Sequence, residues 1–365
     1  MTRSVLLSAR RSVIAPKNGA LAQLSIEELA APVIQAALSD AKIDANQIDE
    51  VIASNALGAG GNPARIVALA AGLPQRVAGL SIDRQCAGGL DAILLADAMI
   101  RAGMCNVVVA GGVESYSRQP DRYRTFPDGR PPERYTQAQF TPWPDRDPDM
   151  AQAAHDLGVG LGISRAEQDA WAVQSHETAR NAPAAHLVPL RDTTRDLFGR
   201  QLTPRLCQRA PVVAGDITAA NAAVAADGAA FVVMASENWA ERRGLSGPRL
   251  VSGCTVGGDP ALPGLAPVAA IEQAMRDARI SPSDVTTAEI MEAYAVQAIA
   301  CQQGAKLDPS RVNLWGGALA RGHPVGASGA VLAVHLVHQL RDLGGFGVAA
   351  IAAAGGLGTA IALEA

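Results

Sequence analysis

Short apolar runs and helix-like apolar periodicity alternate along the first part of the chain. The apolar runs at residues 5–7, 51–53 and 107–110 predict buried strands. Between them, residues 26–42 and 90–101 carry apolar positions at the three-to-four-residue spacing of helices. This alternation predicts an α/β fold in which parallel sheets are covered by helices on both faces.

The same pattern returns in the last third of the chain. Residues 35–49 (QAALSDAKIDANQID) match residues 272–286 (EQAMRDARISPSDVT) without a gap. The helical pattern at 90–101 also has a counterpart at 326–341. Each of these two helices leads to an apolar strand that ends in Ala-Gly-Gly. The chain is therefore predicted to contain two copies of one α/β unit.

The two copies differ after the Ala-Gly-Gly. The second copy reaches its last strand, at 359–363, after a short turn, whereas the first reaches the equivalent strand, at 229–235, more than a hundred residues later. Open α/β folds place ligand-binding parts at such strand ends. We expect three parts: an N-terminal half of residues 1–116 plus 227–246, an inserted loop domain for substrate recognition at 117–226, and a C-terminal half at 247–365.

Composition excludes several classes of function. The net charge is −4 and no basic block occurs, so no nucleic-acid partner is expected. The five cysteines are odd in number and widely spaced, which is typical of a reducing compartment and not of a disulfide or zinc framework. No secretory signal is predicted, and glycines interrupt the apolar C-terminal segment, so no membrane span is expected. We expect a cytoplasmic protein without a metal site.

Cys86 lies where a strand-like stretch passes directly into a helix-like one. A thiol at a helix N-terminus faces unpaired N–H groups and the positive end of the helix dipole, which favour the nucleophilic thiolate. Gly88 and Gly89 follow and would leave room for a substrate to approach the sulfur. The alternative is a small buried apolar residue, as most free cysteines are.

His323 lies in a glycine-rich turn, Gly-His-Pro-Val-Gly, just before the helix of the second copy. It precedes that helix as Cys86 begins the helix of the first copy. A pseudo-twofold axis relating the two helices would bring their N-termini together, with Cys86 facing His323. The arrangement predicts a nucleophile–base pair, although a glycine-rich turn can also hold a structural histidine.

Seven sequence blocks give the chain a specific resemblance. They are Asn62-Pro-Ala-Arg65, the Cys86 segment, Gly111-Gly-Val-Glu-Ser-Tyr-Ser117, Ile163-Ser-Arg-Ala-Glu-Gln-Asp169, Asp227-Gly-Ala-Ala230, Gly258-Asp-Pro260 and Gly322-His-Pro-Val-Gly-Ala-Ser-Gly329. In this order they resemble the motifs of thiolases over most of the chain. The resemblance implies a five-layered α-β-α-β-α core made of two similar halves with an inserted loop domain.

The resemblance also implies an activity and a homodimer or homotetramer. The residue matching Cys86 attacks an acyl-CoA or 3-oxoacyl-CoA and keeps the acyl group on sulfur, while His323 acts as its base. Backbone N–H groups of Cys86 and Ala354 would form an oxyanion hole. The positions matching substrate or CoA contacts are Met150, Ala223, Ala293 and Tyr294. No permanently bound cofactor is implied, because the coenzyme A thioester is the substrate.

Three positions depart from the thiolase pattern. Met291 stands where thiolases carry the asparagine of Asn-Glu-Ala-Phe-Ala, which orients an oxyanion-hole water. Ala352 stands where thiolases carry a second cysteine that moves the Cα proton of acetyl-CoA. Ala223 stands at the position of a CoA-contacting serine. Losing one acid/base group typically costs about 10²–10⁴ in rate.

These departures leave three functions open. The first is a thiolase-type acyltransferase, performing thiolytic cleavage or Claisen condensation, in which Cys86 and His323 suffice. The second is an acyltransferase that acylates Cys86 but passes the acyl group to or from another acceptor or an acyl carrier protein, without Cα proton transfer. The third is a non-catalytic scaffold with a thiolase fold. The intact Cys86 and His323 argue against the third.

Overall fold

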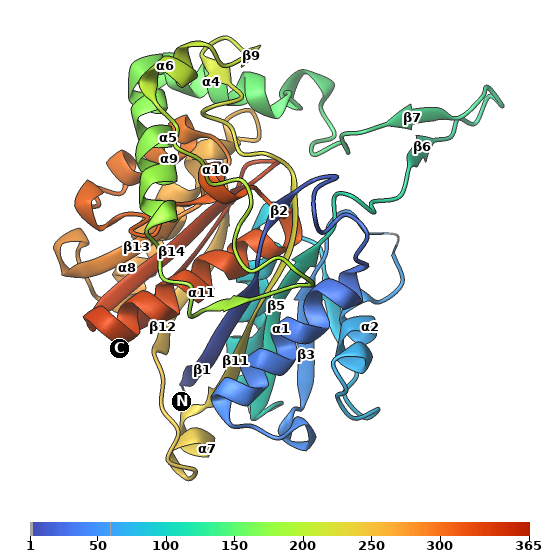
Figure 1. The fold of residues 1–365 in the computed structure, drawn as a ribbon, viewed down its shortest axis with the longest axis vertical. Coiled ribbons are helices and arrows are strands. Elements are labelled where there is room, and N and C mark those ends of the chain that lie inside the picture. Colours follow the sequence, from blue (N-terminus) through green and yellow to red (C-terminus); the bar gives the residue numbers. More distant parts are fainter. Residues whose placement is uncertain (1–2, 59) are drawn as a thin grey trace.

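The predicted duplication is visible in the strand order of the central sheet, in a computed structural model that describes residues 3–58 and 60–365 (Figure 1). The N-terminal half contributes β1 (Ser4–Ser12), β3 (Glu50–Ser54), β4 (Leu80–Ile82), β5 (Val107–Glu114) and β11 (Ala226–Ser236). The C-terminal half contributes β12 (Arg249–Gly257), β13 (Val285–Ile290), β14 (Phe346–Ala353) and β15 (Leu357–Glu364). The strand order β3-β5-β11-β1 of the first half returns as β13-β14-β15-β12 in the second.

The strand directions also repeat, but they correct the expectation of parallel sheets. β3 and β13 run parallel to β5 and β14, whereas β11 and β15 return antiparallel to the same strands. β15 follows β14 through a short turn containing Gly355 and Gly356, and a connection that short can only join antiparallel strands. A short pairing of β1 with β12 joins the two halves into one hydrogen-bonded sheet.

Helices separate and cover the two halves. The outer face of the first half packs against α1 (Ile26–Ala41) and α2 (Pro63–Ala70), and that of the second against α8 (Ala266–Ala278) and α9 (Ala295–Gly304). Between the halves lie α3 (Gly88–Arg101) and α11 (Val325–Leu343), which share one buried apolar cluster with the inner faces of both. This helix–sheet–helix–sheet–helix order confirms the expected five-layered fold.

The matched sequence segments follow the same path in space. α1 and α8 end at Lys42 and Arg279, which occupy matched positions and both adopt left-handed backbone conformations, with φ of 53° and 59°. A 3-10 turn follows each, starting after Asp44 and Ser281. The Gln47 side chain accepts a hydrogen bond from the Asp44 N–H, and the Asp284 side chain accepts one from the Ser281 N–H. The repeat is thus one of backbone geometry as well as of sequence.

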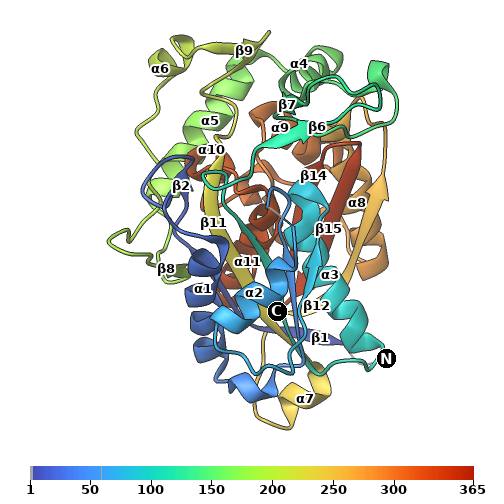
Figure 2. The same cartoon turned by 90° about the vertical axis from the view of Figure 1, so that its right-hand side faces the viewer.

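The segment between β5 and β11 forms its own set of elements. They are β6 (Arg122–Arg124), β7 (Glu133–Tyr135), α4 (Met150–Leu161), α5 (Arg165–Arg180), β8 (Leu187–Val188), α6 (Pro204–Gln208), β9 (Val212–Ala214) and β10 (Ile217–Thr218). The β6–β7 hairpin extends away from the rest of the molecule (Figures 1 and 2). α4 and α5 pack against α9, and α5 also contacts α10 (Ala318–Arg321), the short helix that precedes His323. The helices of the segment therefore lie over the C-terminal half, whereas β8 pairs with β1 of the N-terminal half.

The remaining strand is β2 (Ala15–Pro16), which pairs with β11, and the remaining α-helix is α7 (Glu237–Glu241), which follows β11. Within residues 3–58 and 60–365, no helix is both long enough and apolar enough to cross a membrane.

Candidate active site

Cys86 and His323 face each other at the centre of the molecule. Cys86 lies in a 3-10 turn, Gln85–Ala87, that leads into α3, and His323 lies in the turn that leads into α11. The His323 Nε2 atom is 3.2 Å from the Cys86 Sγ atom. Gln85 adopts a positive φ of 52°, which turns the chain sharply from β4 toward the helix. The structure thus places the two helix N-termini together, as the duplication predicts.

Ser328 determines which nitrogen of His323 faces the thiol. The Ser328 hydroxyl donates its one proton to the carbonyl oxygen of Pro324 at 3.0 Å. It can therefore only accept from His323 Nδ1, which lies 2.6 Å away. With the imidazole proton on Nδ1, the lone pair of Nε2 is directed at the Cys86 thiol. Sequence reasoning included Ser328 in a motif but gave it no role.

Burial determines the protonation of the pair. It raises the pKa of the Cys86 thiol to about 12 and lowers that of His323 to about 4. Near neutral pH a neutral thiol therefore faces a neutral imidazole. This direction is opposite to the thiolate stabilisation expected at a helix N-terminus, because loss of solvent outweighs the backbone hydrogen bond that lowers the pKa of the thiol. Cys86 needs His323 to accept its proton during attack.

The glycines after Cys86 also have another role than the one expected. A Cβ on Gly88 would lie 2.0 Å from the Ser54 hydroxyl oxygen, and a Cβ on Gly89 would lie 2.6 Å from the backbone nitrogen of Ala330. These glycines let α3 approach β3 and α11 closely. They position Cys86 against His323 and do not open a path for substrate.

Glu114, at the end of β5, ties the two halves together beside the pair. Its carboxylate accepts hydrogen bonds from the Asn55 side chain at 2.7 Å, from the Ala56 N–H at 3.0 Å and from the Gly326 N–H at 3.0 Å. Gly326 lies in the first turn of α11, so this carboxylate fixes the helix that follows His323. Burial raises the pKa of Glu114 to about 7.

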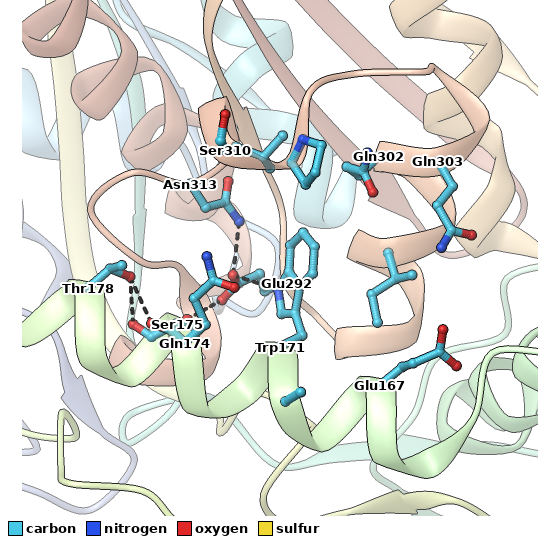
Figure 3. A pocket seen from close by; sticks show the side chains of 14 residues that line it. Glu167, Trp171, Gln174, Ser175, Thr178, Glu292, Gln302, Gln303, Ser310 and Asn313 are labelled. Carbon is cyan, nitrogen blue, oxygen red and sulfur yellow. Dashed lines mark hydrogen bonds between the residues drawn. The ribbon is translucent and has the colours of Figure 1, made fainter.

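Glu292 fixes the chain that leads to His323 (Figure 3). Its carboxylate accepts hydrogen bonds from Trp171 Nε1 (3.0 Å), Ser175 Oγ (2.7 Å), Asn313 Nδ2 (2.9 Å) and the Leu319 N–H (3.2 Å). It also lies at the base of a surface hollow of about 420 Å³ between α5 and α9. Neither Cys86 nor His323 lines that hollow, so it is separate from the pair.

The two positions where thiolase side chains are missing lie on neighbouring strands. Met291 directly follows β13, is 1% exposed and donates its N–H to the Ala350 carbonyl at 2.9 Å. Ala352 and Ala354 are half-buried at the end of β14, which packs against the turn carrying Cys86. A side chain at either strand end is therefore within the region of the pair.

Three of the residues matched to substrate or CoA contacts lie together. The Ala223 N–H donates to the Ala293 carbonyl at 2.9 Å, and Ala222 forms a bridge with Tyr294. The carbonyl of Val224, the residue after Ala223, accepts a hydrogen bond from the His323 N–H at 2.8 Å. The backbone of residues 222–225 therefore runs from Tyr294 to His323. The fourth residue, Met150, begins α4, whose buried side chains form an apolar cluster with Tyr294.

Two phenols flank the reactive pair. Burial raises the pKa of both Tyr116 and Tyr294, and the charge that Cys86 would carry raises it further in each. Tyr116 was not singled out from the sequence, although it lies in the Gly-Gly-Val-Glu-Ser-Tyr-Ser block.

In the described residues no cluster of His, Cys, Asp and Glu side chains is arranged to hold a metal ion.

The pKa shifts predict how Cys86 responds to pH. Since the thiol pKa lies near 12, its reaction with iodoacetamide should still accelerate at pH 10, where a free cysteine is levelling off, as free thiolate forms in addition to the reaction assisted by His323. Between pH 8 and pH 5, acyl transfer should not fall through protonation of His323, whose pKa lies near 4. Rates of alkylation and of acyl transfer measured across this range check both expectations. A plateau near pH 7 would show that Cys86 carries a stabilised thiolate.

Comparison with known proteins relates both halves of the chain to one family. Residues 4–238 match the family model of the thiolase N-terminal domain, and residues 247–365 match that of the thiolase C-terminal domain. A Bacillus subtilis protein, YhfS, which carries a provisional name as an acetyl-CoA C-acetyltransferase, is 38% identical over 99% of both chains. The Staphylococcus aureus protein VraB, with the same provisional name, is 35% identical over 99% of this chain and 98% of its own.

Solved structures agree over the whole chain. The crystal structure of the Bacillus anthracis acetyl-CoA acetyltransferase superposes with a TM-score of 0.92 at 33% identity, covering 100% of this chain and 99% of the other. Human mitochondrial 3-ketoacyl-CoA thiolase in complex with CoA superposes with a TM-score of 0.93 at 31% identity, covering 100% and 98%.

Proposed function

The chain belongs to the thiolase family, and from that premise we propose that it forms an acyl thioester on Cys86 from an acyl-CoA or 3-oxoacyl-CoA, with His323 as the base. The contact between Cys86 and His323 carries this proposal. A thiol 3.2 Å from an imidazole lone pair, which Ser328 holds in that orientation, is arranged for proton transfer to the nitrogen as the sulfur attacks. A non-catalytic scaffold would not require this geometry.

One base is enough to balance the protons of thiolytic cleavage. His323 takes the Cys86 proton as the sulfur attacks the keto carbon. The Cα–Cβ bond then breaks, its electron pair passes to the acetyl-CoA carbon, and His323 returns the proton there. In the second half-reaction, His323 takes the proton of a CoA thiol, whose sulfur displaces Cys86, and then reprotonates Cys86. Ala352 has no acid/base group, so His323 carries out the proton transfers of both half-reactions.

Backbone groups supply the oxyanion stabilisation in this scheme. The N–H groups of Cys86 and Ala354 are proposed to donate to the thioester oxygen as it gains charge. The packing of β14 against the Cys86 turn supports this pairing. The CoA thioester would enter between α4 and residues 222–225, contacting Met150, Ala223, Ala293 and Tyr294. The segment 117–226, which contributes α4, is accordingly proposed as the recognition domain.

A second function is favoured by the missing side chains. With apolar Met291 and Ala352, Cys86 could accept an acyl group without moving a Cα proton and pass it to another acceptor, such as an acyl carrier protein. Both functions share the acyl-Cys86 intermediate and differ in the acceptor that takes the acyl group from the sulfur.

Two parallel assays, one of 3-oxoacyl-CoA cleavage and one of acyl transfer from Cys86, separate the two functions. The purified protein is incubated with 3-oxoacyl-CoA and free CoA, and acetyl-CoA release is followed by chromatography. In parallel, protein acylated by a simple acyl-CoA is offered CoA or acyl carrier protein. Acetyl-CoA release that Cys86→Ala abolishes supports the thiolase reaction. Transfer to carrier protein without any cleavage supports the second function. If neither acetyl-CoA nor acylated carrier protein is formed, both functions are refuted.

The edge of the sheet supports the proposed homodimer or homotetramer. β4 is the last strand at its end of the sheet, and its Leu80 is exposed together with Ile66 and Leu69 on neighbouring α2. An apolar sheet edge of this kind favours pairing with a second copy. Leu80→Arg should shift the mass measured by sedimentation toward the monomer, whereas Leu343→Arg, at an exposed site on α11, should not. An unchanged mass for Leu80→Arg would place the contact elsewhere.

The free state of the cysteines supports the proposed location of the protein in the cell. All five are free thiols, and none pairs with another. This is consistent with the reducing, cytoplasmic compartment that we propose.

A further inference from the structure

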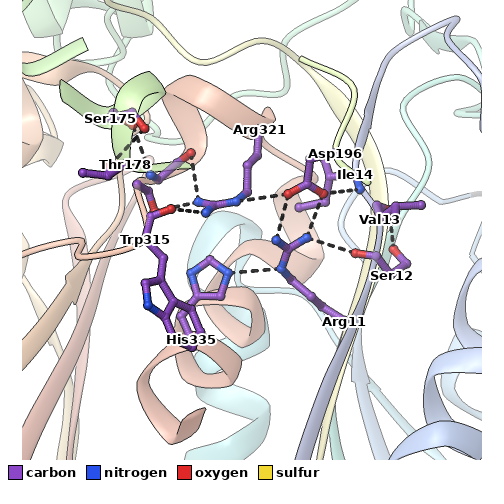
Figure 4. A network of polar contacts seen from close by, with 12 residues as sticks. Arg11, Ser12, Val13, Ile14, Ser175, Thr178, Asp196, Trp315, Arg321 and His335 are labelled. Carbon is purple, nitrogen blue, oxygen red and sulfur yellow. Dashed lines mark hydrogen bonds and ion pairs between the residues drawn. The ribbon is translucent and has the colours of Figure 1, made fainter. Parts of the chain in front are cut away.

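A buried group of charged side chains joins the inserted segment to both halves of the molecule (Figure 4). Asp196, in the loop after β8, accepts two hydrogen bonds from the guanidinium of Arg11 on β1, both at 2.8 Å. It also accepts from Arg321 Nε at 3.1 Å and from the Ile14 N–H at 2.9 Å. One carboxylate thus holds a residue of the N-terminal half and a residue of the C-terminal half.

Arg321 carries this connection to the turn that holds His323. Its guanidinium donates to the carbonyl oxygens of Trp315, Gly316 and Gly317. These bonds hold Arg321 against the backbone of residues 315–317, just before the His323 turn. Its side chain is only 3% exposed. Between Arg321 and His323 stands only Gly322, at φ 101°, where a Cβ would lie 2.6 Å from the Ala226 side chain. Such a crowded linker leaves little freedom between the two residues.

The group continues behind the catalytic pair. Arg11 Nε donates to His335 Nε2 at 3.1 Å, so the proton of this imidazole is on Nδ1, which donates to Glu289 at 3.2 Å. Arg321 and His335 line a cavity of about 20 Å³ together with Ser328, the residue that orients His323. The charged group and Ser328, the residue bonded to His323, therefore line the same small cavity.

We propose that Asp196 is a positioning residue for His323, acting through Arg321. Without this carboxylate, two buried guanidinium groups would repel each other, and Arg321 would lose the acceptor that fixes its Nε. The carbonyl oxygens of residues 315–317 would then shift with it, and the Nε2–Sγ distance would change. Because Asp196 belongs to the inserted segment, this contact also couples the proposed recognition domain to the base. The inference rests on the proposed function only for the role of His323.

Four variants test the positioning role with matched controls. Asp196→Asn keeps the shape of the side chain but removes its charge, and Arg321→Lys keeps the charge but loses the hydrogen bonds to three carbonyls. Arg11→Lys disturbs the same buried group from β1 but keeps the hydrogen bonds from Arg321 to the carbonyl oxygens of residues 315–317. Asp192→Asn removes an exposed carboxylate from the same loop. Each is compared with the wild type by melting temperature, kcat, KM and the rate at which iodoacetamide alkylates Cys86.

A shift of the base should slow proton removal from Cys86 and leave substrate binding unchanged. We expect Asp196→Asn and Arg321→Lys to lower kcat and the alkylation rate by about 10- to 100-fold, with KM changed less than about twofold. Arg11→Lys should lower the melting temperature similarly but slow alkylation much less, and Asp192→Asn should match the wild type.

Two results would overturn the proposal. One is a folded Asp196→Asn or Arg321→Lys variant that is alkylated at the wild-type rate. The other is an equal loss of rate in Arg11→Lys, which would mean that the group only stabilises the fold. If Asp196→Asn does not fold, Arg321→Lys still decides. Alkylation needs no acyl substrate, so it reports on the base even if the proposed acyl transfer fails.

Discussion

Replacing His323 with asparagine should lower the rate of Cys86 acylation by about 10²–10⁴, the usual contribution of one general base. Since burial holds the thiol pKa near 12, few molecules carry a thiolate without help at neutral pH. Asparagine keeps a polar side chain but cannot accept the thiol proton. Rapid-quench mass spectrometry of the acylated protein, with saturating acyl-CoA, measures the rate directly.

Two further variants make the result specific. Ser328→Ala leaves the imidazole in place but removes the acceptor of its Nδ1 proton, so it should slow acylation by about 10-fold, less than loss of the base. His155→Asn, at a histidine whose Nδ1 accepts from the Asp216 N–H, should leave the rate unchanged. An unchanged rate in His323→Asn would show that the thiol is activated by another group.

Restoring the two missing side chains should have the opposite effect. Met291→Asn combined with Ala352→Cys should raise the rate of 3-oxoacyl-CoA cleavage by up to about 10²-fold, because a second acid/base group would then share the proton transfers. Ala352 is half-buried at the end of β14, so a thiol can be added there at little cost in packing. Steady-state cleavage by the double variant and by each single variant measures the gain.

The neighbouring position provides the control for that gain. Ala353→Cys places a thiol one residue further along β14, on a side chain 2% exposed within the central apolar cluster. It should not accelerate cleavage. A double variant no faster than the wild type, or an equal gain from Ala353→Cys, would contradict the placement of the second acid/base position at Ala352.

The sequence supported the fold further than it supported the site. The matched segments at 35–49 and 272–286 predicted a duplication, and the structure repeats even the left-handed residues Lys42 and Arg279. The expectation of parallel sheets was wrong because β11 and β15 run antiparallel to their neighbours, and apolar runs show burial but not orientation. The facing of Cys86 and His323 followed from symmetry, whereas the direction of the thiol pKa shift depends on burial that local sequence does not reveal.

The residues that hold the pair in place were the hardest to predict. Asp196 pairs with Arg11 across 185 residues and with Arg321 across 125, and no local pattern links these positions. Ser328 and Glu114 lay inside recognised motifs, but their roles depend on which backbone and ring atoms they meet. Such contacts are set by tertiary packing, so they could be described only from the structure.

The most direct test of the central claim is the mass of the peptide that contains Cys86. The protein is incubated with a panel of acyl-CoAs, 3-oxoacyl-CoAs and acyl carrier proteins, quenched in acid, digested and analysed by mass spectrometry. We predict an added acyl mass on Cys86 with at least one donor, absent from Cys86→Ala. No adduct from any donor, or the same adduct in Cys86→Ala, would contradict the assignment of Cys86 as an acyl-accepting nucleophile.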